Sequence, residues 1–354
     1  MSHYESLAAL PISISGYELE ERDRTYGSFT RPSTVIHLHG GGEEGQGEDV
    51  VYDVLDHIAH RDAGPVHDLS APSTLGELCE LVGSLDLFPG AAPLMDASAH
   101  YRRWAFESAA LDLALRQAGL ALHAALGLEP RPLSFVCSTR LSGSGDASSV
   151  GPVRDRLERY PDLRFKLDPE NDWDAKLIAA LQGLAGVDVL DLKGHYRGTP
   201  VDVDTDPELY AAVAEAFPNA WIEDPDLEHP GAREALAPHA ERITWDAPLH
   251  SLADITGLET EPRAINSKPS RFGSLEELLS VYEHCAERGI EIYGGGQGEV
   301  GPGRGQIQYL ASLFHAHTSN DIAPSGYNDP SVPADLPTSP MDPVPSQTGF
   351  HWAE

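Results

Sequence analysis

Hydrophobic positions in the second half of the chain follow two alternating spacings. Short apolar runs recur, and between most of them lie stretches in which apolar residues return at every third or fourth position. The short runs predict β-strands, and the longer stretches predict amphipathic helices. The predicted strands are SFVCS (134–138), LRFKL (163–167), VDVLDL (187–192), AWIED (220–224), RITWD (242–246), PRAINSK (262–268) and IEIYG (290–294).

This alternation, repeated along 134–324, predicts a parallel sheet. A chain of 354 residues is long enough for one domain of barrel size and a smaller one. The first strand is not followed by the GxGxxG pattern of a dinucleotide-binding fold. A (β/α)-barrel is therefore favoured over an open, doubly wound sheet.

Residues 1–133 predict a mixed α+β unit. TVIHLHGGGEEGQGEDVVYDVLDHIA (34–59) has the pattern of a strand, a glycine-rich turn and a helix. HYRRWAFESAALDLALRQAGLALHAAL (100–126) predicts a long helix that Gly119 interrupts. The glycine-rich stretch lacks the Gly-Lys-Ser/Thr of a phosphate loop, and its acidic residues would repel phosphate.

The C-terminal segment, 325–354, is rich in proline and has little periodicity. Its composition allows disorder, but the aromatic residues Phe350 and Trp352 favour docking. We expect the segment to pack back on the N-terminal unit.

Composition narrows the classes of partner. The net charge of −32 argues against nucleic acid and against anionic membrane surfaces, because both would repel the chain. The three cysteines form no CxxC pair, which favours a reducing cytoplasm. The first residues show no signal peptide, and no apolar run has the length that spans a bilayer.

Candidate catalytic residues gather where the predicted strands end. In a (β/α)-barrel the active site lies at the carboxyl ends of the strands. The chain has only four lysines, and all but Lys176 fall at such ends. The polar residues at the strand ends are Lys166, Asp191, Lys193, Glu223, Asp224, Asp246 and Lys268.

Three of these carboxylates, Asp191, Glu223 and Asp246, come from neighbouring strands. Unpaired, they would repel one another and raise one another's pKa, whereas a hard divalent cation such as Mg²⁺ removes the repulsion. Beside such a cation the ammonium forms of Lys166 and Lys268 are disfavoured, so these lysines can act as bases near neutral pH, which arginine cannot. The alternative for each single residue is a helix cap or a surface salt bridge.

With these residues in this order, the sequence resembles the enolase superfamily, and within it the muconate lactonizing enzyme subgroup, which includes o-succinylbenzoate synthases and dipeptide epimerases. RFK (164–166) lies where the subgroup has a Lys-x-Lys base motif, WIEDP (221–225) is similar to its fourth-strand segment, and INSKPSRFG (265–273) to its sixth-strand lysine segment. ESAALDLALRQAGLALHAALGL (107–128) resembles the helix that joins the capping domain to the barrel.

The resemblance implies a modified TIM barrel, (β/α)7β, under an N-terminal α+β capping domain. It also implies Asp191, Glu223 and Asp246 as ligands of Mg²⁺, with Mn²⁺ as a substitute. Lys166 would be the base that takes the proton α to a carboxylate, giving an enediolate, and Lys268 the opposite acid/base or a stabilising cation. The expected reaction is dehydration, or racemisation or epimerisation, of a small carboxylate, by a dimer or a higher assembly.

Two alternatives stay open. A catalytically silent barrel with a binding or assembly role would account for three departures from the subgroup. These departures are Arg164 in place of the first lysine of Lys-x-Lys, Lys193 in place of an asparagine, and Ala247 in place of an acid. Metal-dependent hydrolysis would need a water-activating base, for which His195 is the histidine nearest a predicted strand end. Lys193 itself can lower metal affinity, anchor a substrate anion, move a proton or pair with Asp224.

Weaker candidates for substrate binding lie on two loops and on the strands. YGGGQGEVGPGRGQ (293–306) allows close backbone approach and precedes a helix whose N–H groups can face an anion. ERDRTYGSFTR (21–31) matches the mobile capping loop of the family. HLH (37–39) and HAH (315–317) lack a third ligand for a zinc-like site. The candidate residues are Arg24, Tyr26, Phe29, Arg164, Lys193, Asn266, Gln297, Glu299 and Arg304.

Overall fold

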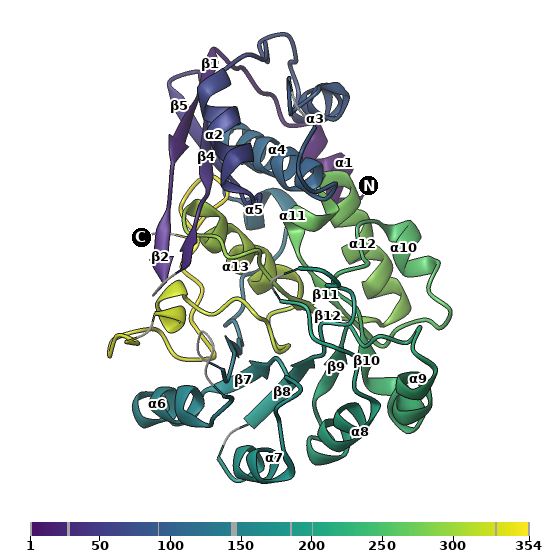
Figure 1. Cartoon of the computed structure of the whole chain (residues 1–354). Helices are drawn as coiled ribbons and strands as arrows, with labels where there is room; N and C mark the ends of the chain where they lie inside the picture. Colours follow the sequence, from purple (N-terminus) through teal and green to yellow (C-terminus); the bar gives the residue numbers. More distant parts are fainter. Residues whose placement is uncertain are drawn as a thin grey trace.

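The computed structural model describes residues 2–26, 29–90, 92–142, 147–184, 186–199, 201–329 and 331–352. Figure 1 shows an N-terminal unit of strands and helices above a barrel, with the C-terminal segment along one side. In the described part of the chain, no helix combines the length and the apolar character that a membrane crossing requires.

The second half of the chain forms the predicted barrel. Its strands pair in parallel in the order β10-β9-β8-β7-β6, and β11 pairs in parallel with β12. Parallel bridges close the ring: Trp245 with Ile265, Gly295 with Asp321, and Phe135 with Asn320. Residues 320–321 thus take the place of the eighth strand. The strands are β6 (Cys137–Thr139), β7 (Arg164–Leu167), β8 (Gly186–Asp191), β9 (Trp221–Glu223), β10 (Ile243–Thr244), β11 (Ala264–Ser267) and β12 (Glu291–Gly294).

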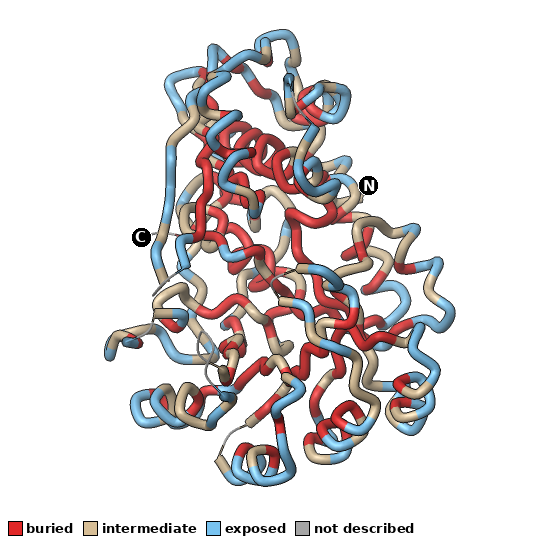
Figure 2. Tube along the Cα trace, in the orientation of Figure 1, coloured by how far each residue is buried: buried red, intermediate tan, exposed pale blue. Residues whose placement is uncertain are grey.

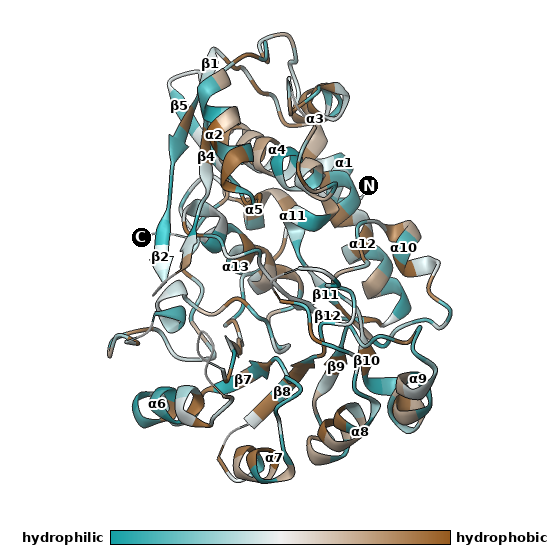
Figure 3. Ribbon diagram, viewed as in Figure 1, coloured by the Kyte–Doolittle hydropathy of each residue, from teal (hydrophilic) through white to brown (hydrophobic). Residues whose placement is uncertain are grey.

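Helices follow the barrel strands and form its outer layer (Figure 1). Their apolar faces and the strands build a core that includes Phe165, Leu181, Val213 and Ile222, each almost fully buried. Figure 3 shows the hydrophobic colour on β8 and the hydrophilic colour on β2 and β5. The barrel helices are α6 (Gly151–Arg159), α7 (Ala175–Gln182), α8 (Pro207–Ala216), α9 (Pro230–Leu236), η1 (Ala237–Arg242), α10 (Leu252–Thr256), α11 (Pro269–Phe272), α12 (Leu275–Arg288) and α13 (Pro302–Phe314).

The N-terminal unit is a three-stranded antiparallel sheet, in the order β1-β4-β5, that packs on a long buried helix, α4 (Figure 2). A second hairpin, β2 with β3, projects from it. One core joins this unit to α11, α12 and α13. The elements are α1 (His3–Ala8), β1 (Gly16–Glu21), β2 (Arg24–Tyr26), β3 (Phe29–Arg31), β4 (Thr34–Gly40), β5 (Glu43–Asp49), α2 (Val54–Ala63), α3 (Leu75–Ser84), α4 (Ser98–Gln117) and α5 (Leu122–Leu126).

The glycine-rich stretch is mostly a strand, which corrects the predicted turn. Only Gly41 and Gly42 turn the chain, both with positive φ, and β5 begins at the next residue. Gly45 and Gly47 lie where α4 presses on the sheet: a Cβ at Gly47 would meet the Ala105 carbonyl oxygen at 2.0 Å. These glycines therefore serve helix–sheet packing.

The C-terminal segment packs on both parts of the molecule. Its first part, including η2 (Ser325–Asn328), lies on the barrel, where the ring of Tyr327 is fully buried against Tyr160. Its last part lies on α4 and α13: Phe350 is fully buried beside Trp104, and the Trp352 ring stacks on Tyr309. We expected the C-terminal segment to pack on the N-terminal unit, and the structure shows that it packs on the barrel as well.

Candidate active site

The carboxyl ends of the parallel strands bring the predicted site residues to one rim. Lys166 lies within β7, Asp191 ends β8 and Glu223 ends β9, while Asp246 and Lys268 follow β10 and β11. All five side chains are buried. Buried charged groups need partners, so their contacts define the chemistry of the site.

Lys166 is held by carboxylates. Its Nζ lies 2.5 Å from Glu223 Oε1, 3.0 Å from Asp191 Oδ2 and 3.4 Å from Asp321 Oδ2. Burial disfavours its ammonium form, but Asp191 and Glu223 raise the pKa of Lys166 well above the ordinary value. In this arrangement the lysine is protonated.

Lys268 has a similar partner on the other side of the cluster. Its Nζ donates to Asp246 Oδ2 at 2.7 Å, and the Tyr196 hydroxyl donates to the same oxygen at 3.2 Å. Arg271 Nη1 lies 3.5 Å from Asp246 Oδ1, which is buried and has no hydrogen-bond partner among the described residues. Burial opposes ionisation of Asp246, but Arg271 and Lys268 hold its pKa below the ordinary value.

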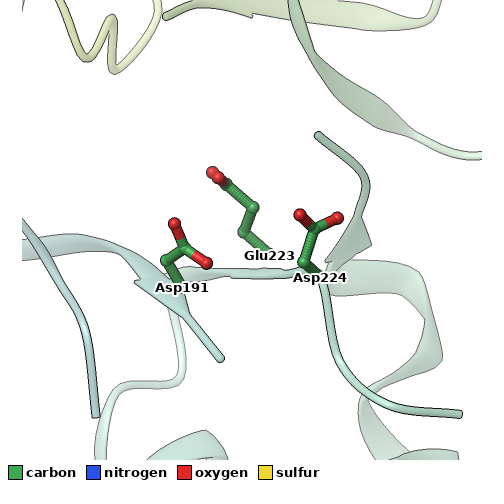
Figure 4. A group of neighbouring side chains, drawn as sticks. All are labelled: Asp191, Glu223 and Asp224. Atoms are coloured by element: carbon green, nitrogen blue, oxygen red, sulfur yellow. The ribbon is translucent and has the colours of Figure 1, made fainter. Parts of the chain in front are cut away.

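The carboxylates that lie closest together are not the predicted three. Oxygens of Asp191, Glu223 and Asp224 all lie within 4.8 Å of one another, and Asp246 is outside this group. Figure 4 shows the three side chains directed from the strand ends into one space. Asp224 Oδ1 and Oδ2 accept the backbone N–H groups of Asp246 and Ala247, both at 2.8 Å. Asp224 therefore fixes the start of the loop that carries Asp246.

The site carries more negative than positive charge. Six carboxylates (Asp168, Asp191, Glu223, Asp224, Asp246 and Asp321) share it with four cations (Lys166, Lys193, Lys268 and Arg271). Burial, with neighbouring carboxylates, raises the pKa of Glu223 to about 8 and that of Asp224 to about 7. If all six carboxylates were ionised, they would exceed the cations by two, and the raised pKa values of Glu223 and Asp224 mean that protons relieve this excess while no cation is bound. The all-oxygen donor set fits a hard divalent cation, which would take the place of these protons.

Lys193 also belongs to the cluster. Its ammonium contacts Asp191 Oδ2 and lies 3.5 Å from Asp168 Oδ1. The salt bridge that the sequence suggested with Asp224 is not among the ion pairs of the described residues. Instead, the Gly194 N–H donates to the Asp224 carbonyl oxygen at 2.8 Å.

Arg164 does not take part in the site. Its side chain is about half exposed and pairs with Asp188, near the start of β8. Arg164 is the first residue of β7, at the end of the strand opposite the rim, so the structure does not bring this predicted substrate contact to the cluster. Asn266, by contrast, is buried in β11 and donates to both oxygens of Glu223 at 3.3 Å.

The loop after β12 contacts the N-terminal unit. Gln297 is buried, accepts from the Tyr52 hydroxyl at 2.7 Å and donates to the Tyr101 hydroxyl at 3.2 Å. Glu299 accepts the Gln297 N–H at 2.8 Å and lies 3.4 Å from the Arg304 guanidinium. Gln297 therefore joins the loop to the N-terminal unit, and Glu299 and Arg304 make contacts within the loop and the start of α13.

The N-terminus of α13 is already filled by a side chain of this chain. Glu48 accepts the N–H groups of Val300, Gly301 and Gly303 at 2.7–3.0 Å, and the Ser33 hydroxyl at 2.8 Å. The expected site for a substrate anion at this helix end is therefore occupied by Glu48. Nothing in the sequence pattern of β5 indicated this.

The predicted capping loop is the β2–β3 hairpin, whose residues 27–28 lie outside the described residues. Arg24 Nη2 donates to both oxygens of Asp329 at 2.9 Å, which ties the hairpin to the C-terminal segment. Tyr26 pairs with Phe29, whose side chain is more than half exposed. Among the hydrogen bonds and ion pairs of the described ranges, none joins Arg24 or Tyr26 to the carboxylate cluster.

Sequence reasoning missed several residues of the cluster. The Tyr293 hydroxyl donates to Glu223 Oε2 at 2.7 Å, and Asp321 reaches Lys166 from the eighth strand. Tyr293 is the third of the four residues of β12, and Asp321 lies in a bridge for which the sequence pattern predicted no strand. Arg271 lies in α11, a helix of four residues that is too short for its sequence pattern to show which side chains face the cluster. His195 packs edge-on against Trp245.

Two family models match the chain. The N-terminal domain described as a domain of unknown function (DUF8230) matches residues 5–125, and the corresponding C-terminal domain matches residues 129–329.

Known proteins with similar sequences are enzymes. An o-succinylbenzoate synthase from Geobacillus kaustophilus is 25% identical over 235 residues, 63% of this chain and 59% of the relative. An N-succinylamino acid racemase from an Amycolatopsis species is 30% identical over 236 residues, 62% of this chain and 60% of the relative. The matches thus span less than two thirds of these relatives.

Solved structures share the whole fold. A dipeptide epimerase from Methylococcus capsulatus, complexed with Mg ion, has a TM-score of 0.66 at 18% identity, over 88% of this chain and 90% of that chain. Other structures of this fold are described as members of the enolase superfamily. The predicted (β/α)7β barrel is confirmed, and its fold is that of the solved structures described as enolase superfamily members.

Proposed function

Because this chain belongs to the family of the DUF8230 domains and has the fold of the enolase superfamily, we propose that it is a metal-dependent lyase or isomerase. In this proposal it removes the proton α to the carboxylate of a small substrate. The observation that carries the proposal is the pairing of two buried lysines, Lys166 and Lys268, with carboxylates at one barrel rim. The sequence relatives named as synthase and racemase support the same class of reaction.

Asp191, Glu223 and Asp246 would hold the divalent cation. We choose Asp246 over Asp224 as the third ligand because both oxygens of Asp224 already accept backbone N–H groups. Asp246 Oδ1, by contrast, is buried without a hydrogen-bond partner among the described residues, and buried carboxylate oxygens need one. Mg²⁺ is the expected ion, with Mn²⁺ as a substitute. When bound, it would supply positive charge that acidifies the α-proton of a carboxylate substrate.

Lys166 and Lys268 would move the proton. Each ammonium is now held by a proposed metal ligand, so each lysine is kept at the rim in a fixed position. Once the carboxylates turn from the lysines to a cation, desolvation favours the neutral amine that a base requires. Lys166 would take the proton, and Lys268 would act as the opposite acid/base or as a cation.

The proposed substrate class rests on the likeness to an N-succinylamino acid racemase and to a dipeptide epimerase. The guanidinium groups of Arg24 and Arg304 are paired with carboxylates of the chain, and Glu48 fills the α13 N-terminus. We propose a small carboxylate, N-acylated or a dipeptide. The outcome would be dehydration, or racemisation or epimerisation. A cytoplasmic location and a dimer or higher assembly complete the proposal.

The test is exchange of the α-proton in D₂O. A panel of N-acyl amino acids, dipeptides and other small carboxylates is incubated with Mg²⁺ and the enzyme, and deuterium uptake is followed by NMR. The proposal predicts uptake with at least one class, and none with Lys166→Met. The exposed Lys176→Met is the matched control. A wild type that binds carboxylates without any exchange would favour the silent barrel instead.

A further inference from the structure

Lys193 is held in an unusual backbone conformation at the carboxylate cluster. Its φ is +56°, and among the described residues the other non-glycine residue with positive φ is Asp224. A hydrogen bond from the Gly194 N–H to the Asp224 carbonyl oxygen joins the two loops. Such backbone strain persists only where the surrounding structure fixes it, and it concentrates at functional sites.

This conformation directs the Lys193 side chain back onto the residue that ends β8. Its ammonium contacts Asp191 Oδ2, the same oxygen that Lys166 Nζ reaches at 3.0 Å. The Lys193 N–H donates to the other oxygen, Asp191 Oδ1, at 3.3 Å. Lys193 therefore engages both oxygens of the proposed metal ligand.

A second carboxylate and an aromatic ring complete the surroundings of this ammonium. Asp168 Oδ1 lies 3.5 Å from Lys193 Nζ, and Asp168 is not one of the proposed metal ligands. The ammonium also lies 5.3 Å from the centre of the Tyr196 ring, within cation–π range. Asp168 and the Tyr196 ring can therefore hold the Lys193 ammonium when Asp191 binds another cation.

We propose that Lys193 is an internal counter-cation that competes with the divalent metal ion for Asp191 and weakens metal binding. This inference rests on the proposed function, because it concerns the affinity of the proposed metal site. A fixed positive charge beside a divalent ion is repulsive, and the repulsion is strong in a buried site. Asp168 would hold the ammonium while Asp191 binds the ion, so loss of Asp168 would strengthen the competition.

The two partners of this ion pair therefore give opposite predictions. Lys193→Met keeps the length of the side chain and the same backbone strain but removes the charge, and the Kd for Mn²⁺ should fall at least tenfold. Asp168→Asn leaves the ammonium on Asp191, and the Kd should rise. Lys176→Met, on the exposed part of α7, should not change it. The Kd is measured by Mn²⁺ electron paramagnetic resonance, with circular dichroism as a check on folding.

The Mn²⁺ Kd values of these variants either support the proposal or overturn it. A lower Kd in Lys193→Met and a higher Kd in Asp168→Asn support the proposal. An unchanged or higher Kd in Lys193→Met, in a folded protein, overturns it and leaves the metal site of the proposed function intact. If neither the wild type nor Lys193→Met binds Mn²⁺ at a saturable site, both proposals fail.

Discussion

Lys268 Nζ donates to Asp246 Oδ2 at 2.7 Å, so a proposed acid/base group is paired with a proposed metal ligand. Lys166 stands in the same relation to Glu223. In the site, the proposed acid/base lysines therefore form ion pairs with the proposed metal ligands. Both sets depend on each other, since a buried carboxylate without a cation and a buried lysine without an anion are each costly.

Loss of either lysine should separate binding from proton transfer. In Lys268→Met we expect α-proton exchange with an active carboxylate to fall at least 100-fold, a typical contribution of a general acid or base. Mn²⁺ binding should persist, because no proposed ligand is removed. Deuterium exchange and Mn²⁺ titration on the same preparation check this, and loss of metal binding in a folded Lys268→Met protein would argue against the division of roles.

Glu48 should stabilise the packing of the cap on the barrel. In Glu48→Gln the amide presents donors to the N–H groups of Val300, Gly301 and Gly303, and charge-assisted hydrogen bonds are lost. We expect the free energy of unfolding to fall by about 1–3 kcal/mol. Urea denaturation measures it. The exposed Glu43→Gln, on the same strand, is the control and should change little.

The end of the C-terminal segment should contribute to stability. Phe350 is fully buried between Trp104 and Tyr309, so Phe350→Ala should lower the free energy of unfolding by about 3–5 kcal/mol. Val344→Ala, at a half-exposed position, should cost much less. Equal effects of the two substitutions in urea denaturation would mean that the segment does not dock as described.

The sequence predicted the barrel well because its signals are local. Each predicted strand lies at or beside an observed one, and Lys166, Asp191 and Glu223 follow from the rule that parallel strands end at one rim. Contacts set by register or by tertiary packing could not be read from spacing. Arg164 begins β7 and pairs with Asp188 outside the cluster, and Gly47 lies in a strand that α4 crosses too closely for a side chain.

The same limit applies to Glu48 and Asp224. Glu48 lies in β5, and its role depends on a helix that begins more than 250 residues later. Asp224 follows Glu223 directly and looked like a neighbour of the site, but its carboxylate supports the backbone of Asp246. Long-range hydrogen bonds of this kind leave no periodic trace in a sequence.

His315 should make stability fall in mild acid. It is buried, its Nδ1–H donates to Asn320 Oδ1 at 2.7 Å, and burial lowers its pKa to about 4. The unfolded chain, with an ordinary histidine pKa of about 6.5, binds the proton first as pH falls. This contribution is intact above pH 6.5 and is lost toward pH 4, at up to about 1.4 kcal/mol per pH unit.

The check is urea denaturation of the wild type and of His315→Gln at several pH values between 7 and 5. The variant lacks the titrating ring, so its stability should depend less on pH. The difference between the two free energies of unfolding should shrink as the pH falls. Parallel pH profiles would contradict the assignment.

The most direct test of the metal site is Mn²⁺ titration by electron paramagnetic resonance in the wild type, Asp246→Asn and Asp224→Asn. The account predicts one saturable site per chain in the wild type and its loss in Asp246→Asn. Asp224→Asn should keep the site with reduced affinity, because the amide can still accept one backbone N–H. No saturable site in the wild type, or binding that survives Asp246→Asn but not Asp224→Asn, would contradict the account.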